Sequence, residues 1–272
     1  MKILVTGAKG MLGQDLCPIL EDCGYEVVET DVDKLDITNA EQVKQVLSEE
    51  KPDMVIHCAA YTNVDKAEED LKTAELINVT GTENIAETCG KLGITLVYIS
   101  TDYVFDGETV EPYTTEDLPN PINNYGATKY EGEEAVRSLC EKYYVVRTSW
   151  LYGHHGKNFV ETMIGLADRN EINVVDDQVG CPTWTVELAN GIVKLFSKPY
   201  GTYHVCGSGF TTWYGFAKEI FAQSGLEVNL KPCTTDGFPR PAKRPKFSVM
   251  DNGGICRKWQ AALKDYLELR EV

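Results

Sequence analysis

Tyr125 and Lys129 form the most specific chemical pattern in the sequence. They stand four residues apart, which places a phenol and an ammonium on one face of a predicted helix over 124–142. An ammonium beside a phenol favours the phenolate, so we expect Lys129 to lower the pKa of Tyr125 toward neutrality. Thr101 ends a predicted strand, and its hydroxyl could hold a substrate carbonyl oxygen against that phenol. Together the three residues predict proton donation to a carbonyl oxygen.

Three glycines stand directly between the first predicted strand and the first predicted helix. Gly7, Gly10 and Gly13 have the spacing G-x-x-G-x-x-G. In that order they allow a tight turn, a close approach of backbone to a pyrophosphate, and close packing of the helix on the strand. The helix N-terminus adds free N–H groups and the positive end of its dipole. This placement predicts a dinucleotide site rather than a plain turn.

Asp31 ends the second predicted strand, 18 residues beyond Gly13. A carboxylate there can accept hydrogen bonds from the adenosine ribose hydroxyls, which favours NAD over NADP. Lys9, within the glycine loop, could instead meet a 2′-phosphate, so the choice between NADPH and NADH stays open. Asp36 and Ile37 follow, and could contact the amino edge and the face of the adenine.

The elements that must position these groups alternate along the first half of the chain. Short, nearly continuous apolar runs predict strands covered on both faces, at Lys2–Val5, Glu26–Glu29, Met54–Cys58, Ile94–Ser100 and Tyr143–Arg147. Helix-like segments lie between them, near 11–22, 39–50, 66–92 and 124–142. Thr38 and Glu41 predict a capping box at the start of the second helix. The alternation predicts an α/β fold, with a Rossmann-type doubly wound parallel sheet and a ligand crevice where its strands end.

The rhythm changes after Trp150. Glycine, proline and aromatic residues cluster there, and helical stretches recur near 157–169, 185–197, 213–224 and 255–269. We therefore expect a dinucleotide-binding Rossmann domain over 1–149 and a smaller, mixed substrate-binding portion over 150–272. Segments near 185–206 could return to the first domain.

Longer stretches of sequence narrow the interpretation. The chain resembles the extended short-chain dehydrogenase/reductase family, and within it the dTDP-4-dehydrorhamnose reductases. The glycine loop and Tyr-x-x-x-Lys are shared across the superfamily, whereas Ala-Tyr-Thr-x-Val-Asp, Thr-Asp-Tyr-Val-Phe and Trp-Leu-Tyr-Gly are more specific. The matching segments are 57–68, 100–107, 147–153, 177–183 and 244–251, so the resemblance runs over nearly the whole chain.

The resemblance implies NAD(P)H-dependent reduction of the C4 ketone of dTDP-4-dehydro-6-deoxy-L-mannose to dTDP-L-rhamnose. It makes Tyr125 the proton donor to the C4 oxygen, Lys129 the residue that tunes Tyr125 and holds the nicotinamide ribose, and Thr101 a hydrogen-bond partner of the reacting oxygen. Trp150 matches a tryptophan against the sugar, and Asp102 a carboxylate beside the substrate. The implied cofactor contacts are Gly10, Met11, Leu12, Asp31, Asp36, Ile37, Ala59, Ala60, Tyr61, Tyr125 and Lys129. Tyr61 stands where some relatives have His, and we expect its ring to keep the contact.

The overall charge excludes several classes of partner. The 272 residues include 26 Lys and Arg against 42 Asp and Glu, a formal net charge of −16. Such acidity argues against nucleic-acid binding and against docking on an anionic membrane. No apolar run is long enough to span a membrane, and the first apolar stretch is too short for a signal peptide. Nine scattered cysteines without a Cys-x-x-Cys pair indicate reduced thiols and a cytoplasmic protein.

One basic segment could supply the local positive charge that a sugar-nucleotide diphosphate needs. Residues 240–246 contain two Arg and two Lys and no acid. We expect this loop, and Arg244 in particular, to meet the diphosphate of the substrate.

Other functions remain as alternatives. One is another extended short-chain sugar-nucleotide epimerase or reductase; Tyr103, after Thr101 and Asp102, disfavours a dehydratase, which typically has an Asp-Glu pair there. The other is a non-catalytic regulatory subunit of the methionine adenosyltransferase type. The four histidines lack metal-ligand spacing, so no metal site is expected. A homodimer is possible, but no element of the sequence specifies one.

Overall fold

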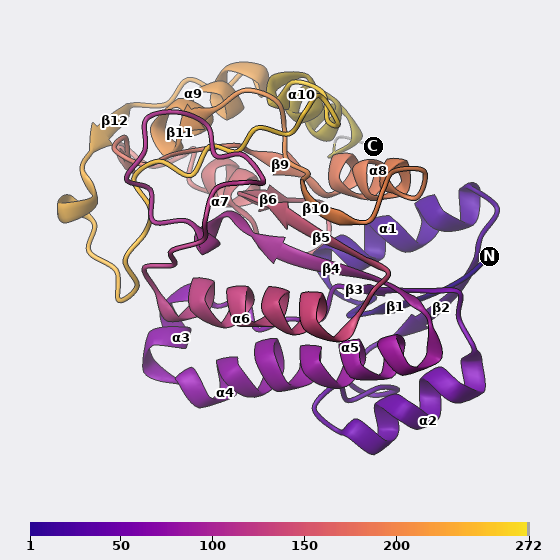
Figure 1. The fold of residues 1–272 in the computed structure, drawn as a ribbon. Helices are drawn as coiled ribbons and strands as arrows, with labels where there is room; N and C mark the ends of the chain where they lie inside the picture. The colour runs from indigo at the N-terminus through magenta and orange to yellow at the C-terminus, as the bar shows by residue number, and fades with distance from the viewer. Residues whose placement is uncertain (271–272) are drawn as a thin grey trace.

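A six-stranded parallel sheet forms the centre of the molecule in the computed structural model, which describes residues 1–270 (Figure 1). Its strand order is β10-β5-β4-β3-β1-β2, and every pairing is parallel. The strands are β1 (Lys2–Thr6), β2 (Glu26–Thr30), β3 (Met54–His57), β4 (Thr95–Thr101), β5 (Tyr143–Thr148) and β10 (Gly201–His204). The predicted Rossmann-type α/β fold is confirmed.

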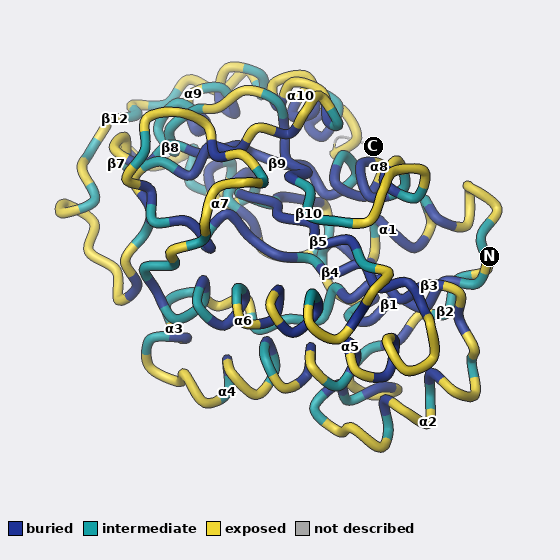
Figure 2. Tube along the Cα trace, in the orientation of Figure 1, coloured by how far each residue is buried: buried dark blue, intermediate teal, exposed yellow. Residues whose placement is uncertain are grey.

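Helices cover both faces of this sheet because successive strand residues point to opposite sides. On one face Ile3, Val5 and Ile56 share a core with α1 (Met11–Asp22) and α8 (Thr185–Leu195). On the other face Leu4 and Val55 pack under α2 (Ala40–Glu50), α5 (Gly81–Leu92) and α6 (Asn124–Leu139). The inner strands β1, β3, β4 and β5 are consequently almost wholly buried, whereas the edge strands β2 and β10 are partly exposed (Figure 2).

A less regular layer covers the end of the sheet where β4 and β5 terminate (Figure 1). It contains three two-stranded sheets: β6 (Leu151–Tyr152) with β9 (Thr183–Trp184), β7 (Ile172–Val175) with β12 (Leu230–Cys233), and β8 (Val179–Gly180) with β11 (Thr211–Thr212). Its helices are α7 (Phe159–Gly165), α9 (Trp213–Gln223) and α10 (Trp259–Arg270), which share a core of their own.

The segment 185–206 lies with the elements of the first half. The chain leaves the C-terminal layer at α8, which packs against α1, and then adds β10 to the sheet beside β5. The division of the chain into 1–149 and 150–272 stays a prediction.

Two local predictions are wrong. The predicted helix over 66–92 is divided into α3 (Val64–Glu69), α4 (Leu71–Glu75), a π-helical turn η1 (Leu76–Thr80) and α5. Asp70 separates the first two, because its backbone is not helical and its side chain caps α4 by accepting from the Thr73 N–H. The capping box at α2 does not form either. Asn39 caps that helix, while Thr38 donates its hydroxyl to Asp36.

Candidate active site

A cavity of about 820 Å³ opens at the carboxyl ends of the sheet strands. In this sheet β2 is added on one side of β1, and β3 is added on the other side. The strand order therefore reverses at β1, and open α/β sheets bind their ligands at such a switch point. The strand order also sets the order of groups along the cavity, from Asp31 after β2, through the glycine loop after β1 and Cys58 after β3, to Thr101 at the end of β4 and Trp150 after β5.

The glycine loop leaves no space for side chains. Gly7 has φ +66°, and a Cβ there would lie 2.7 Å from the backbone nitrogen of Ala59. A Cβ on Gly13 would lie 2.6 Å from the Ala8 backbone. Gly10 precedes α1 and provides no side-chain cap, so the first N–H groups of the helix are left for a ligand. All three glycines line the cavity, together with Met11 and Leu12, which fits a pyrophosphate at this end.

The ribose end of the predicted cofactor site is acidic. Asp31 lines the cavity, and its carboxylate accepts hydrogen bonds from the backbone N–H groups of Lys9 and Val32. The Lys9 ammonium lies 2.8 Å from Asp33, so it is paired on the surface. Asp36 and Ile37 also line the cavity.

The loop after β3 contributes backbone rather than an aromatic ring. Ala59, Ala60 and Thr62 line the cavity, whereas Tyr61 is not among the lining residues. The peptide N–H and C=O of Tyr61 are both bonded to the buried side-chain amide of Asn78. Asn78, on the π-helical turn, therefore fixes the course of this loop.

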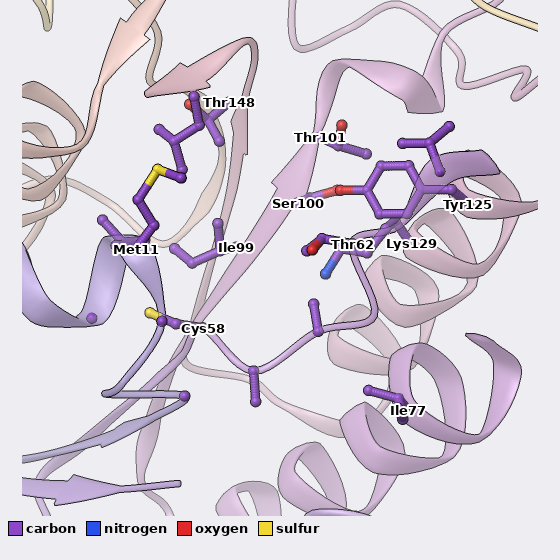
Figure 3. Close-up of a pocket in the computed structure, with 18 of the residues that line it drawn as sticks. Met11, Cys58, Thr62, Ile77, Ile99, Ser100, Thr101, Tyr125, Lys129 and Thr148 are labelled. Carbon is purple, nitrogen blue, oxygen red and sulfur yellow. The ribbon is translucent and has the colours of Figure 1, made fainter. Parts of the chain in front are cut away.

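Tyr125 and Lys129 reach from α6 toward the end of β4, where Thr101 lies, with Met11 and Cys58 across the cavity (Figure 3). The expected lowering of the Tyr125 pKa is wrong. Burial raises the pKa of Tyr125 to about 12, and the Thr101 hydroxyl opposes that shift only in part. Burial also lowers the pKa of Lys129 to about 7, although Glu133 favours its charged form. The Lys129 Nζ lies 4.1 Å from the centre of the Tyr98 ring.

Asp102 is a buried carboxylate in the cavity wall. Its Oδ1 accepts from the Thr101 hydroxyl at 3.1 Å, and its Oδ2 accepts from Ser248 at 2.6 Å. Burial nevertheless raises the pKa of Asp102 to about 6. The group therefore exchanges a proton close to neutral pH.

A second buried carboxylate, Glu133, lies on the face of α6 that packs on the sheet. Glu133 accepts from Ser100 at 2.5 Å, from Arg147 at 2.9 and 2.7 Å, and from Arg137 at 2.7 Å. These cations hold the pKa of Glu133 below its usual range against the opposing effect of burial. The cluster ties α6 to β4 and β5, and so fixes the helix that presents Tyr125 to the strand that presents Thr101.

The far end of the cavity is aromatic. The rings of Trp150 and Trp213 stack with centroids 3.6 Å apart and 6° between their planes, and both line the cavity. Trp150 has the unusual φ of +45°, and a Cβ on Gly180 would lie 2.4 Å from its ring. Backbone and neighbours thus hold the Trp150 indole in one place.

Arg244 is not among the residues that line the cavity. Its guanidinium lies 3.0 Å from Asp65 and also donates to the carbonyl of Ala242. The Arg244 guanidinium is therefore bonded to other groups of the protein outside the cavity. Its expected contact with the diphosphate of the substrate stays a prediction.

Some residues of the site were not predicted as site residues from the sequence. Thr148, Ser149, Lys157 and Trp213 line the cavity, and Ser248 reaches Asp102 from the far end of the chain. Thr148 pairs with Thr101 in the sheet register, and its buried hydroxyl has no hydrogen-bond partner within residues 1–270. Register could have identified Thr148, whereas only the fold brings Trp213 and Ser248 to the site.

Comparison with known proteins agrees with this geometry. The family model described as the RmlD substrate binding domain matches residues 1–271. The chain belongs to this family. A dTDP-4-dehydrorhamnose reductase from Streptomyces griseus is 41% identical over 96% of this chain and 91% of its own length.

Two solved structures are similar along the whole chain. A dTDP-4-dehydrorhamnose reductase from Clostridium acetobutylicum has a TM-score of 0.98 at 49% identity and covers 100% of both chains. One from Bacillus anthracis, in complex with NADP, has a TM-score of 0.95 at 44% identity and covers 100% of this chain and 99% of that one. The family expected from the sequence motifs is confirmed.

Residues 1–270 contain neither a candidate metal site nor a candidate membrane-spanning helix. No group of three or more His, Cys, Asp or Glu side chains is placed to hold a metal ion. No helix in this range has the length and apolar character needed to cross a membrane.

Proposed function

We propose that this protein is an NAD(P)H-dependent oxidoreductase that reduces the C4 ketone of dTDP-4-dehydrorhamnose to give dTDP-L-rhamnose. The observation that carries the proposal is one continuous cavity, lined by the glycine loop, by Thr101 with Tyr125 and Lys129, and by Trp150. Relatives named dTDP-4-dehydrorhamnose reductase are 36% to 41% identical over 96% to 98% of this chain.

The nicotinamide supplies the hydride when it is bound, and the protein supplies the proton and the placement. Tyr125 lies at the end of β4 with a pKa raised to about 12, so its phenol is fully protonated at neutral pH. It remains a stronger acid than the alcohol formed from the ketone, and can therefore donate its proton to the developing alkoxide. Lys129 adds positive charge at the same place when it is protonated.

The other residues position the two ligands. Gly7, Gly10 and the first turn of α1 suit the dinucleotide pyrophosphate, and Asp31 suits a ribose. Trp150 offers a flat apolar face for the deoxy-sugar. The reductant is NADPH or NADH, and the choice stays open because Asp31 favours NADH whereas Lys9 favours NADPH.

The decisive test is oxidation of NADPH and NADH in the presence of the dTDP-4-keto-6-deoxy-sugar. We expect turnover by the wild type, and a fall in kcat of about 10² to 10⁴ in Tyr125→Phe, because the variant lacks the proton donor. Tyr130→Phe is a matched control, since Tyr130 lies on the same helix outside the cavity lining, and its activity should be unchanged. Wild-type rates in Tyr125→Phe would remove the role given to this residue.

The same assay separates the alternatives. An epimerase would keep tightly bound NAD through purification and would not consume added NAD(P)H with the ketone. A regulatory subunit of the methionine adenosyltransferase type would show no oxidation at all. Absence of oxidation by the wild type would therefore contradict the reductase function.

We place the protein in the cytoplasm, where its sugar-nucleotide substrate and reduced cofactor would be found. All nine cysteines are free thiols, which suits a reducing compartment. A homodimer remains a prediction that sedimentation of the purified protein would test.

A further inference from the structure

Asp102 is held in the cavity wall without a compensating cation. The influences on its pKa are burial, the hydroxyls of Ser248 and Thr101, and neighbouring backbone N–H groups. Burial of a carboxylate without a charged partner is costly, so the two hydroxyl donors largely determine where the carboxylate can lie.

Ser248 reaches this carboxylate from a segment fixed by other parts of the fold. Its N–H donates to the carbonyl of Val179 at 2.8 Å, and the Val179 N–H donates to Lys246 at 2.8 Å. Ser248 is only 2% exposed and is not among the residues that line the cavity. It therefore contacts Asp102 from behind, and a ligand in the cavity would meet Asp102 rather than Ser248.

The position of Asp102 controls the hydroxyl of Thr101. The Thr101 Oγ1 accepts from the Tyr103 N–H at 3.2 Å and donates its only proton to Asp102 at 3.1 Å. An ionised Asp102 keeps that proton, whereas a proton on Asp102 Oδ1 would make this oxygen a donor to Thr101 Oγ1 and free the Thr101 proton to turn toward the cavity. Ser248 thus acts on Thr101 through Asp102.

Few other ionisable groups face Asp102. Tyr103 of the short helix η2 (Asp102–Val104), Tyr125 of α6 and Cys206 after β10 each interact with its charge. Burial raises the pKa of Tyr103 and Tyr125, and a hydrogen bond with Cys181 together with burial raises that of Cys206, so all three are neutral around pH 6. Arg244, from the same segment as Ser248, acts on Tyr103. Lys129, whose pKa burial lowers to about 7, also titrates near neutrality in this cavity, so the titration of Asp102 has to be followed at its own carboxyl group.

We propose that Ser248 is a positioning residue of the reduction, which holds the Asp102 carboxylate and thereby sets the direction of the Thr101 hydroxyl beside Tyr125. This inference rests on the proposed function. It gives the segment 246–250 a part in the chemistry, although that segment follows Thr101 by almost 150 residues in the chain.

The first test measures the pKa of Asp102 in the free protein, in the absence of substrate and cofactor. Carboxyl ¹³C NMR of aspartate-labelled protein, with Asp102→Asn to assign the signal, gives the pKa of Asp102. Ser248→Ala removes a bond that favours the ionised form, so the pKa should rise by about one unit. Ser208→Ala is the matched control, because its hydroxyl makes a comparable 2.6 Å bond to the Cys256 carbonyl away from the site.

The second test reads the reaction. In Ser248→Ala we expect kcat to fall about tenfold while the KM for the dTDP-sugar changes less than twofold, because Ser248 does not line the cavity. The inflection of kcat/KM near pH 6 should move upward with the NMR value. Ser248→Thr, which restores a hydroxyl, should recover both, and Ser208→Ala should match the wild type.

Two results would overturn the proposal. One is an unchanged Asp102 pKa in Ser248→Ala with native melting behaviour; the other is a shifted pKa with unchanged kcat and pH profile. A shifted pKa in a protein whose wild type oxidises neither NADPH nor NADH would instead count against the proposed function.

Discussion

Two buried carboxylates lie on opposite sides of the end of β4, and different kinds of group stabilise their negative charges. Ser100 donates to Glu133 of α6, and the next residue, Thr101, donates to Asp102 in the cavity wall. Glu133 is surrounded by two arginines, which keep its pKa low. Asp102 has only hydroxyl and backbone donors, and its pKa is raised to about 6.

The difference follows from the alternation of side chains along a strand. Ser100 is paired in register with Arg147, whereas Thr101 is paired with Thr148. One side of the strand end therefore carries an ionic cluster of Glu133 with two arginines, and the other carries hydroxyl groups around a carboxyl that can exchange its proton. The first fixes the position of α6, and the second remains available for chemistry.

The largest effect should come from breaking the ionic cluster. Glu133→Gln leaves Arg147, which is 2% exposed, without its charged partner. Removal of one member of a buried ion pair typically costs about 3 to 5 kcal/mol, so the free energy of unfolding measured with urea should fall by this amount.

Glu134→Gln provides the control for that measurement. Glu134 is paired with Arg137 on the surface, where its side chain is 56% exposed, so the loss should be below about 1 kcal/mol. Equal losses of unfolding free energy in the two variants would show that the buried Glu133 cluster stabilises the fold no more than a surface ion pair does.

Asp102→Asn should have the opposite effect on stability. The folded pKa of about 6 exceeds the usual value of 3.8, so the folded protein binds more protons than the unfolded chain between these pH values. Wild-type stability therefore falls as pH rises through this window, by up to about 3 kcal/mol, and the variant lacks this loss. We expect the variant to melt a few degrees higher than the wild type at pH 8.

Below pH 4 the two proteins should melt alike, which serves as an internal control. Reductase activity of Asp102→Asn should fall, since an amide cannot exchange the proton. A variant that is destabilised equally at pH 4 and pH 8 would contradict the raised pKa of Asp102.

The smallest effect on stability should come from Thr148→Val. The Thr148 hydroxyl is buried without a partner among the described residues, so an isosteric apolar side chain leaves the free energy of unfolding unchanged or raises it by about 1 kcal/mol. Because Thr148 lines the cavity, we expect the KM for the sugar or the cofactor to rise severalfold. Unchanged KM values for both ligands would show that the Thr148 hydroxyl contacts neither of them.

Sequence reasoning predicted five of the six strands of the sheet because most of them are nearly continuous apolar runs, whereas the edge strand β10 was not predicted as a strand. The predicted strand at Lys2–Val5, for example, differs from β1 by one residue. Tyr125, Lys129 and Thr101 could be predicted as one site from the sequence. The i, i+4 spacing of the first two and the position of Thr101 at a strand end are both local features of the chain. The glycine loop was predictable for the same reason.

The errors concern effects that only tertiary structure determines. The long helix over 66–92 was interrupted by one capping side chain, Asp70, in a segment that otherwise favours helix. The Tyr125 pKa was predicted in the wrong direction because proximity to Lys129 is visible in the sequence and burial of both groups is not. No local pattern connects Ser248 with Asp102, or Trp213 with Trp150.

The late position of β10 in the chain has a consequence for synthesis. A nascent chain that has reached residue 150 already contains Thr101, Tyr125 and Lys129. The outer edge of β5 and the face of α1 under α8 stay uncovered until residues 185–204 have left the ribosome. An unpaired strand edge of this kind invites wrong pairing. Thr101, Tyr125 and Lys129 are thus encoded in the first half of the chain. The sheet that positions them receives its last strand, β10, only from the last third.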